Sequence, residues 1–186
     1  MPKSPDESLQ RAHLADALRQ EFDGTLAARV ERYLQASHHR IVPDTSFASA
    51  SAECIKLFRD GHFYGCISLS QAVGEALIRH MCQSNSWRPA NNFEENVRTL
   101  RQRAFIDDAF SDLCTRLWQQ RRDYHHLNPT VATDLSELET TALEKISVLA
   151  NLQAWTFEYT IHDGKLRPAR PQYWRQLDPG KLSKSS

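Results

Sequence analysis

The residues best suited to chemistry are gathered near the end of one predicted helix. From Trp118 to Pro129 the chain reads WQQRRDYHHLNP, which places two arginines and two histidines within six residues. A guanidinium group can clamp a phosphate and stabilise a pentacoordinate transition state, and an imidazole can pass a proton near neutral pH. These side-chain types suit phosphodiester cleavage in which the RNA 2′-hydroxyl is the nucleophile and a 2′,3′-cyclic phosphate forms. Such a reaction needs no metal ion and no other cofactor.

The same residues also have a purely structural interpretation. Cationic side chains near the C-terminus of a helix cap its carbonyl groups and complement its dipole, which accounts for Arg121 to His126 equally well. The spacing alone does not decide, because Arg32 precedes His38 and His39 at similar distances. His38 and His39 have no third ligand at a recognisable spacing, so we expect solvated side chains there and no metal site.

The segments that must position these residues have the periodicity of helices. Apolar residues recur every three or four positions, and we expect them to form the core. The predicted helices cover residues 7–34, 45–59, 62–83, 93–103, 107–126 and 134–161, with Asn128-Pro129 ending the fifth. Strand-like alternation is confined to residues 158–166, around Asp163-Gly164. The predicted fold class is therefore all-α, an up-and-down helical bundle with a short extended C-terminal tail.

Length and charge divide the 186 residues into three predicted parts. These are an N-terminal helical region (1–44), the bundle (45–161) and a basic tail (162–186). The tail carries a net charge of +4, and since the whole chain is neutral the rest carries −4. An RNA partner would thus have to meet a local basic patch. Four dispersed cysteines without a C-x-x-C spacing, and no long apolar run, predict a soluble cytoplasmic protein with no membrane association.

A family resemblance accompanies these residues. The segment Phe58–Glu75, FRDGHFYGCISLSQAVGE, lies in a four-helix pattern whose late helix ends in RRDYHHLNP. This resembles the HEPN superfamily over about residues 45–160, with Arg121-x4-His126 as the motif. The resemblance implies a homodimeric, metal-independent endoribonuclease that cleaves single-stranded or loop RNA in a cleft shared by two protomers. Arg121 would hold the phosphate and His126 would move the proton.

The resemblance also implies further contacts and partners. Arg122, His125 and Tyr124 are the expected substrate-binding residues beside Arg121 and His126. Many HEPN proteins are toxins or antiviral defence effectors, so an inhibitory partner protein is expected in addition to RNA and the second protomer.

Other interpretations of the same chain stay open. Arg122 stands where the family usually has a small polar residue, and Arg122 shares a helix face with His126 more naturally than Arg121 does. This departure favours a non-catalytic HEPN-like module that dimerises or binds a nucleotide or a partner protein. The neutral charge favours a third interpretation, a helical adaptor. Glu75 is expected to be a partly exposed helix residue, and Tyr173-Trp174 to anchor the tail on the domain; a buried partner for an arginine and a base-stacking surface are the alternatives.

Overall fold

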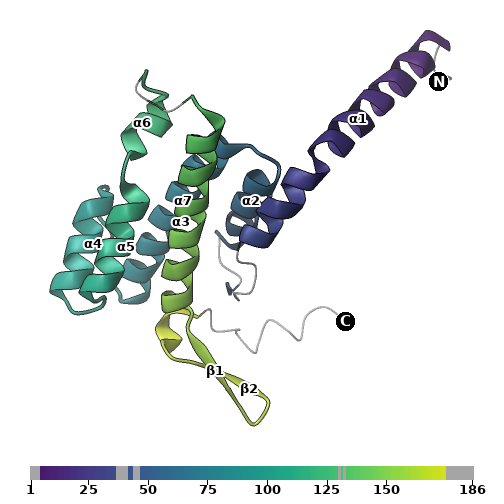
Figure 1. Cartoon of the computed structure of the whole chain (residues 1–186). Helices are drawn as coiled ribbons and strands as arrows, with labels where there is room; N and C mark the ends of the chain where they lie inside the picture. Colours follow the sequence, from purple (N-terminus) through teal and green to yellow (C-terminus); the bar gives the residue numbers. More distant parts are fainter. Residues whose placement is uncertain (1–4, 37–41, 44–46, 130, 132, 175–186) are drawn as a thin grey trace.

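The computed structural model describes residues 5–36, 42–43, 47–129, 131 and 133–174. Most of them form an all-α bundle, which confirms the predicted fold class (Figure 1). Two long helices, α3 (Phe63–Ser84) and α7 (Leu135–Thr156), pack along each other at its centre, and α2 (Ala48–Arg59) and α5 (Asp108–Trp118) pack against this pair. A further helix, α4 (Phe93–Gln102), packs against α3 and α5.

The central helix α3 is buried along the face that its sequence pattern indicates. Cys66, Ile67 and Leu77 lie on this face and are wholly inaccessible to solvent. Gly74 permits a close approach of α5, because a Cβ atom at this position would collide with the Leu117 side chain. Gly74 therefore fixes how closely α3 and α5 pack.

Local signals in the sequence mark where several helices begin. Asn92, Asp107 and Asp134 are the N-cap residues of α4, α5 and α7, and each side chain accepts a hydrogen bond from a backbone N–H of the first turn. Gly61 turns the chain between α2 and α3 with φ of +82°, a conformation that glycine adopts at little cost. The caps and this turn fix the entry of each helix into the bundle.

The predicted continuous helix over residues 107–126 is wrong. α5 ends at Trp118, and a separate short helix, α6 (Arg121–His126), follows. Gln119 has an extended backbone, and Gln120 adopts a left-handed conformation with φ of +60°. The arginines and histidines therefore belong to their own helix, with a direction different from that of α5.

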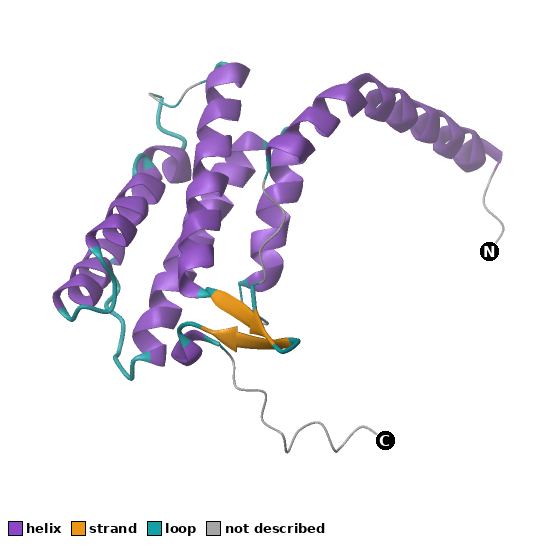
Figure 2. Cartoon of the chain, turned by 60° about the horizontal axis from the view of Figure 1, so that its bottom comes forward, coloured by secondary structure: helices purple, strands orange, loops and turns teal. Residues whose placement is uncertain are grey.

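The predicted helix over 134–161 is also too long, because α7 ends at Thr156. The chain continues as a hairpin of β1 (Tyr159–His162) and β2 (Lys165–Pro168), seen below the bundle in Figure 2. Asp163 and Gly164 both have positive φ, as a two-residue hairpin turn requires. The strand-like alternation around this turn therefore predicted the hairpin correctly. Because β1 ends at His162, the hairpin spans the predicted boundary between the bundle (45–161) and the tail (162–186).

The residues after the hairpin anchor it to the bundle. Tyr173, in the 3₁₀ turn η1 (Pro171–Tyr173), is buried, and its hydroxyl accepts a hydrogen bond from Asn85 Nδ2 at 3.1 Å. Trp174 packs edge-on against Phe157, and Arg170 lies over the Trp155 ring at 3.7 Å. Tyr173 and Trp174 thus pack on the bundle, as the anchoring interpretation predicts, whereas the hairpin before them is largely exposed.

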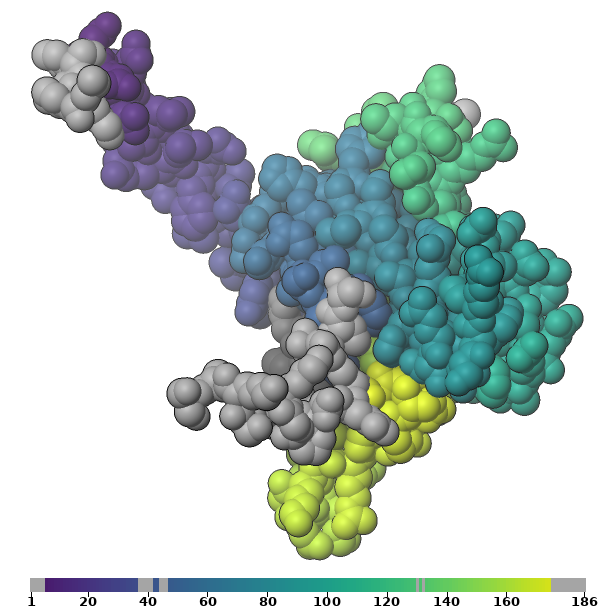
Figure 3. Space-filling view, turned by 180° about the vertical axis from the view of Figure 1, so that it is seen from behind, coloured from purple at the N-terminus to yellow at the C-terminus, as the bar shows by residue number. Residues whose placement is uncertain are grey.

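The N-terminal helix α1 (Pro5–Gln35) extends away from the bundle (Figures 1 and 3). It runs unbroken through Gly24, and only its last turns are held, through Arg29–Asp60 at 3.5 Å and Arg32–Glu139 at 3.0 Å. The apolar side chains along the rest of the helix are exposed. The expectation that they belong to the core is therefore wrong for α1.

Candidate functional site

Four of the five residues predicted to act on a substrate line one groove. Arg121, Arg122, His125 and His126 of α6 border an open depression of about 430 Å³. The rest of its lining comes from the end of α5, from the start of α4 with the loop before it, and from α3; these residues are Trp118, Asn91, Asn92, Phe93, Glu94 and Glu75. Tyr124, the fifth predicted residue, lies outside this groove.

The geometry of α6 explains this division. At 100° per residue, the four groove residues span about 140° of the helix circumference, whereas Tyr124 falls outside that arc. Its ring is 4% exposed and packs near that of Tyr64 on α3, with the centroids 6.3 Å apart. Tyr124 therefore docks α6 on the bundle, and this contact turns the arginines and histidines outward.

Two buried polar side chains stabilise the break before α6. Gln71 of α3 donates through Nε2 to the carbonyl oxygens of Leu117 and Gln119, at 3.0 and 3.1 Å. Lys145 of α7 donates through Nζ to the carbonyl oxygens of Arg116 and Gln119, at 2.6 and 3.1 Å. These donors therefore satisfy two carbonyls in the last turn of α5 and the carbonyl of Gln119 after it, which stabilises the end of the helix at this position.

The ammonium group of Lys145 is nearly excluded from solvent, and this burial lowers its pKa from the ordinary lysine value. Sequence reasoning missed both buried residues. The position of Lys145 could have been noticed, because this lysine lies on the apolar face of its helix, three residues after Ala142 and one before Ile146. Nothing in the sequence around Gln71 indicates that its side chain is buried.

The far end of α6 is closed by a local cap. Leu127 has φ of +49°, and the backbone N–H of Asn128 donates to the carbonyl oxygen of Asp123 at 3.0 Å. The Asn128 side chain also donates to the Asp123 carboxylate at 2.8 Å. Asp123 thus accepts hydrogen bonds from Asn128 on the side of α6 that faces away from the groove.

Arg121 has the most distinctive environment of the four groove residues. Its guanidinium lies 5.4 Å from the centre of the Trp118 ring, and Trp118 in turn stacks on Phe93 with the centroids 4.1 Å apart. Nε and Nη1 of Arg121 are buried and have no hydrogen-bond acceptor within the described chain. Buried donors without acceptors are costly, so an anion that enters the groove would gain these hydrogen bonds.

The histidines lie at the exposed end of the same helix. The rings of His125 and His126 are solvent-accessible, and their centroids are 5.2 Å apart in an edge-to-face arrangement. Two carboxylates also border the groove. Glu75 is partly exposed, as expected, and accepts a hydrogen bond from Arg79 at 2.7 Å, while Glu94 lies in the first turn of α4.

Other candidate chemistries find little support. Among the described residues no three His, Cys, Asp or Glu side chains converge as metal ligands, and His38 and His39 lie outside those residues. No described helix is long and apolar enough to cross a membrane.

The four cysteines are buried thiols, and burial raises their pKa values to about 11 for Cys54 and Cys82 and about 12 for Cys66 and Cys114. Burial thus favours the protonated, weakly nucleophilic form of each thiol.

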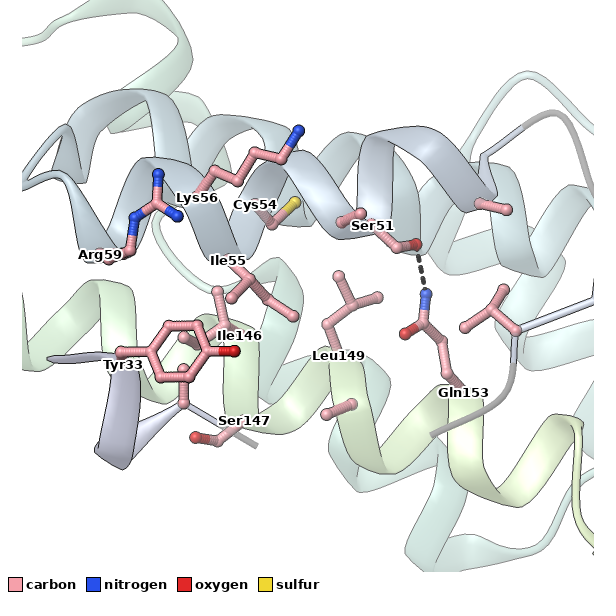
Figure 4. Close-up of a pocket in the computed structure, with 15 residues that line it drawn as sticks. Tyr33, Ser51, Cys54, Ile55, Lys56, Arg59, Ile146, Ser147, Leu149 and Gln153 are labelled. Carbon is pink, nitrogen blue, oxygen red and sulfur yellow. Dashed lines mark hydrogen bonds between the residues drawn. The ribbon is translucent and has the colours of Figure 1, made fainter. Parts of the chain in front are cut away.

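A second cavity, of about 480 Å³, lies between α2, α7 and the end of α1 (Figure 4). Its wall is largely apolar, including Ile55 and Leu149, and the polar pair Ser51 and Gln153 is joined by a hydrogen bond of 2.6 Å. Arg59, at its edge, is paired with Asp60 at 2.8 Å. None of the described residues that line this cavity is a histidine, whereas two histidines border the α6 groove, so we take the groove as the candidate for acid–base chemistry.

Comparison with known proteins gives no functional assignment for this chain. No family model matches the chain, and no curated protein or solved structure is significantly similar to it.

Proposed function

We propose that the protein is a HEPN-like, metal-independent endoribonuclease acting on single-stranded or loop RNA at the α6 groove. The observation that carries this proposal is the juxtaposition of Arg121, which has two buried donors without acceptors, with the exposed imidazoles of His125 and His126. The guanidinium offers hydrogen bonds to a phosphate oxygen, and an imidazole offers a proton acceptor beside it.

The residues have distinct roles in this reaction. Arg121 binds a non-bridging phosphate oxygen, and the stacked rings of Trp118 and Phe93 hold the guanidinium in place. His126 takes the proton of the 2′-hydroxyl, whose oxygen attacks phosphorus and expels the 5′-oxygen of the next nucleotide. The leaving oxygen takes up a proton, and the products are a 2′,3′-cyclic phosphate and a 5′-hydroxyl end.

Arg122 and His125 are substrate-binding residues in this proposal. Both are exposed beside Arg121 and His126, where they add positive charge for neighbouring phosphates. Tyr124 has no such role, because its ring is buried against α3.

The proposed assembly is a homodimer in which the grooves of two protomers face each other across the RNA. The second His126 is then available to protonate the leaving oxygen. An inhibitory protein that covers the groove would restrain the activity of a toxin or defence effector.

The proposal is tested by cleavage of a labelled single-stranded RNA in the presence of EDTA. We expect wild type to cleave, and Arg121→Ala and His126→Ala each to lower the rate by about 10² to 10⁴, the range for a lost acid–base or charge-stabilising group. Arg122→Ala and His125→Ala should mainly weaken substrate binding. Arg116→Ala is the matched control, since Arg116 is an exposed α5 arginine outside the groove lining.

A cleavage rate that falls with Arg122→Ala and is unchanged by Arg121→Ala would assign phosphate binding to Arg122 instead of Arg121. Equal rates for all variants, including His126→Ala, would overturn the proposal.

A second candidate function is a non-catalytic binding module at the same groove. The carboxylates of Glu75 and Glu94 favour it, because they lower the positive potential where a phosphodiester would lie. Such a module would bind a nucleotide or RNA in a manner sensitive to Arg121→Ala and would leave the RNA intact. Binding by fluorescence anisotropy, with gel analysis of the same sample, separates the two candidates.

A further inference from the structure

The projecting part of α1 carries a continuous row of exposed apolar side chains. Six of them follow one another every fourth residue, namely Leu14, Leu18, Phe22, Leu26, Val30 and Leu34. Each is between 44% and 73% exposed, and within the described chain no other element covers them. Monomeric proteins rarely expose a contiguous apolar surface of this extent, so the row indicates an interface.

The spacing of the row determines how it can pair. Four residues advance about 400° around a helix, which is about 40° beyond one turn, so the row winds along α1. Rows of this i±4 kind pack against each other in the commonest class of helix pair, which crosses at about −50°. The five members from Leu14 to Val30 are symmetric about Phe22, so an antiparallel copy places Leu18 opposite Leu26 and Leu14 opposite Val30, and Leu34 lies beyond the paired stretch.

The residues that flank this row complement themselves in the same orientation. Moving one position along from each apolar row member gives a second row: Ala15, Arg19, Asp23, Ala27, Glu31 and Gln35. Arg11, four residues before Ala15, continues this row toward the N-terminus. In an antiparallel pair this flank faces the same flank of the other helix. Arg19 then meets Asp23 of the partner subunit, Arg11 meets Glu31 of the partner subunit, and the two alanines meet each other.

We infer that α1 is an antiparallel homodimerisation helix, with the two-fold axis near Phe22. Each of the five paired side chains is between 44% and 62% exposed, so pairing would bury large apolar groups on both helices, and the aliphatic parts of the flanking arginines would add to the contact. A membrane surface fits less well. α1 has six acidic residues against four arginines and no lysine, whereas interfacial helices are rich in basic residues.

This contact is separate from the proposed ribonuclease groove. α1 is held by α2 and by Glu139 of α7, whereas α6 packs on α3 at the other side of the bundle (Figure 1). Pairing through α1 leaves the groove free for the groove-to-groove contact across RNA, so in the absence of RNA the α1 contact alone sets the oligomeric state. Its test does not depend on RNA cleavage.

The test is the oligomeric state of the full chain, measured by sedimentation equilibrium at micromolar concentration. Wild type should sediment as a dimer of twice the 21.4 kDa chain mass. Leu18→Glu and Phe22→Glu should each raise the dimer dissociation constant at least tenfold. Gln20→Glu is the matched control, since it adds the same charge between them on the opposite side of the helix and should leave the constant unchanged. Circular dichroism at 222 nm checks that each variant retains its helices.

A charge exchange tests the antiparallel orientation. Arg19→Asp and Asp23→Arg should each weaken the dimer, and the double variant should restore it. A double variant no tighter than either single variant would overturn the antiparallel pairing. A monomeric wild type, or equal effects of Phe22→Glu and Gln20→Glu, would overturn the dimer itself. A monomer that cosediments with phosphatidylserine vesicles would assign the row to membranes instead.

Discussion

Arg121 begins α6 two residues after the end of α5, and this junction is stabilised by two buried residues, Gln71 and Lys145. Neither lines the groove, and together they donate hydrogen bonds to the carbonyl oxygens of Arg116 and Leu117 in α5 and of Gln119 just after it. The guanidinium of Arg121 rests on Trp118, the last residue of α5, so any shift of this junction moves the proposed phosphate-binding group. At the scale of single residues, the groove thus depends on partners from α3 and α7.

Replacement of Lys145 by methionine should destabilise the fold. Lys145→Met keeps the apolar stem and removes the donor to the carbonyl oxygens of Arg116 and Gln119. We expect the free energy of unfolding to fall by about 2–3 kcal/mol, the cost of leaving buried acceptors unsatisfied. Urea denaturation followed by circular dichroism measures this. The neighbouring Glu144→Gln loses only an exposed ion pair with Arg116 and should change stability by less than about 1 kcal/mol; equal losses for both variants would contradict the account.

The buried thiols should make stability fall in alkaline solution. Burial raises the pKa of Cys114 to about 12, above its ordinary value of 9.0. Below pH 9 the thiol is protonated in both states, and its contribution is fully present. As the pH rises from 9 towards 12 the unfolded chain ionises first, so the free energy of unfolding decreases. Cys114→Ala should make this decrease shallower in urea titrations at pH 8 and pH 10, and parallel slopes for the variant and wild type would refute this assignment.

At the scale of elements, the sequence predicts helix starts and the hairpin better than it predicts the break before α6. Asn92, Asp107 and Asp163-Gly164 are local signals whose effect needs no distant partner. Gln119 and Gln120 include neither glycine nor proline, and the apolar period runs through them. The break depends on carbonyl partners 26 to 48 residues away in the sequence, which no local pattern contains.

The junction also contains removable backbone strain. Gln120 has φ of +60°, which costs a residue with a side chain roughly 1 kcal/mol and costs glycine little. Gln120→Gly should therefore raise the free energy of unfolding by up to about 1 kcal/mol. Gln119→Gly is the matched control, because Gln119 has φ of −50° and gains nothing from glycine. Thermal denaturation compares the two, and a less stable Gln120→Gly variant would show that the left-handed conformation carries no strain.

At the scale of the whole molecule, apolar periodicity predicts the all-α bundle correctly but cannot tell an inward face from an outward one. Leu77 of α3 and Phe22 of α1 belong to equally helical patterns, yet the first is wholly buried and the second is 46% exposed. The difference arises because α1 is held to the bundle only near its end, which is a property of tertiary packing. The same limit applies to the site. Four of the five residues that the sequence suggests as site residues line the groove, but only the tertiary structure shows that Tyr124 is buried against α3.

The central claim is that this groove cleaves RNA through the substrate's own 2′-hydroxyl, and one measurement tests it most directly. The protein is incubated in EDTA with an RNA oligonucleotide and with its copy carrying a single 2′-deoxy nucleotide at the cleaved position, and the fragment masses are determined by mass spectrometry. We predict 2′,3′-cyclic phosphate and 5′-hydroxyl ends from the RNA and no cut at the 2′-deoxy position. Cleavage at the 2′-deoxy position, or ends carrying a 5′-phosphate, would contradict the account.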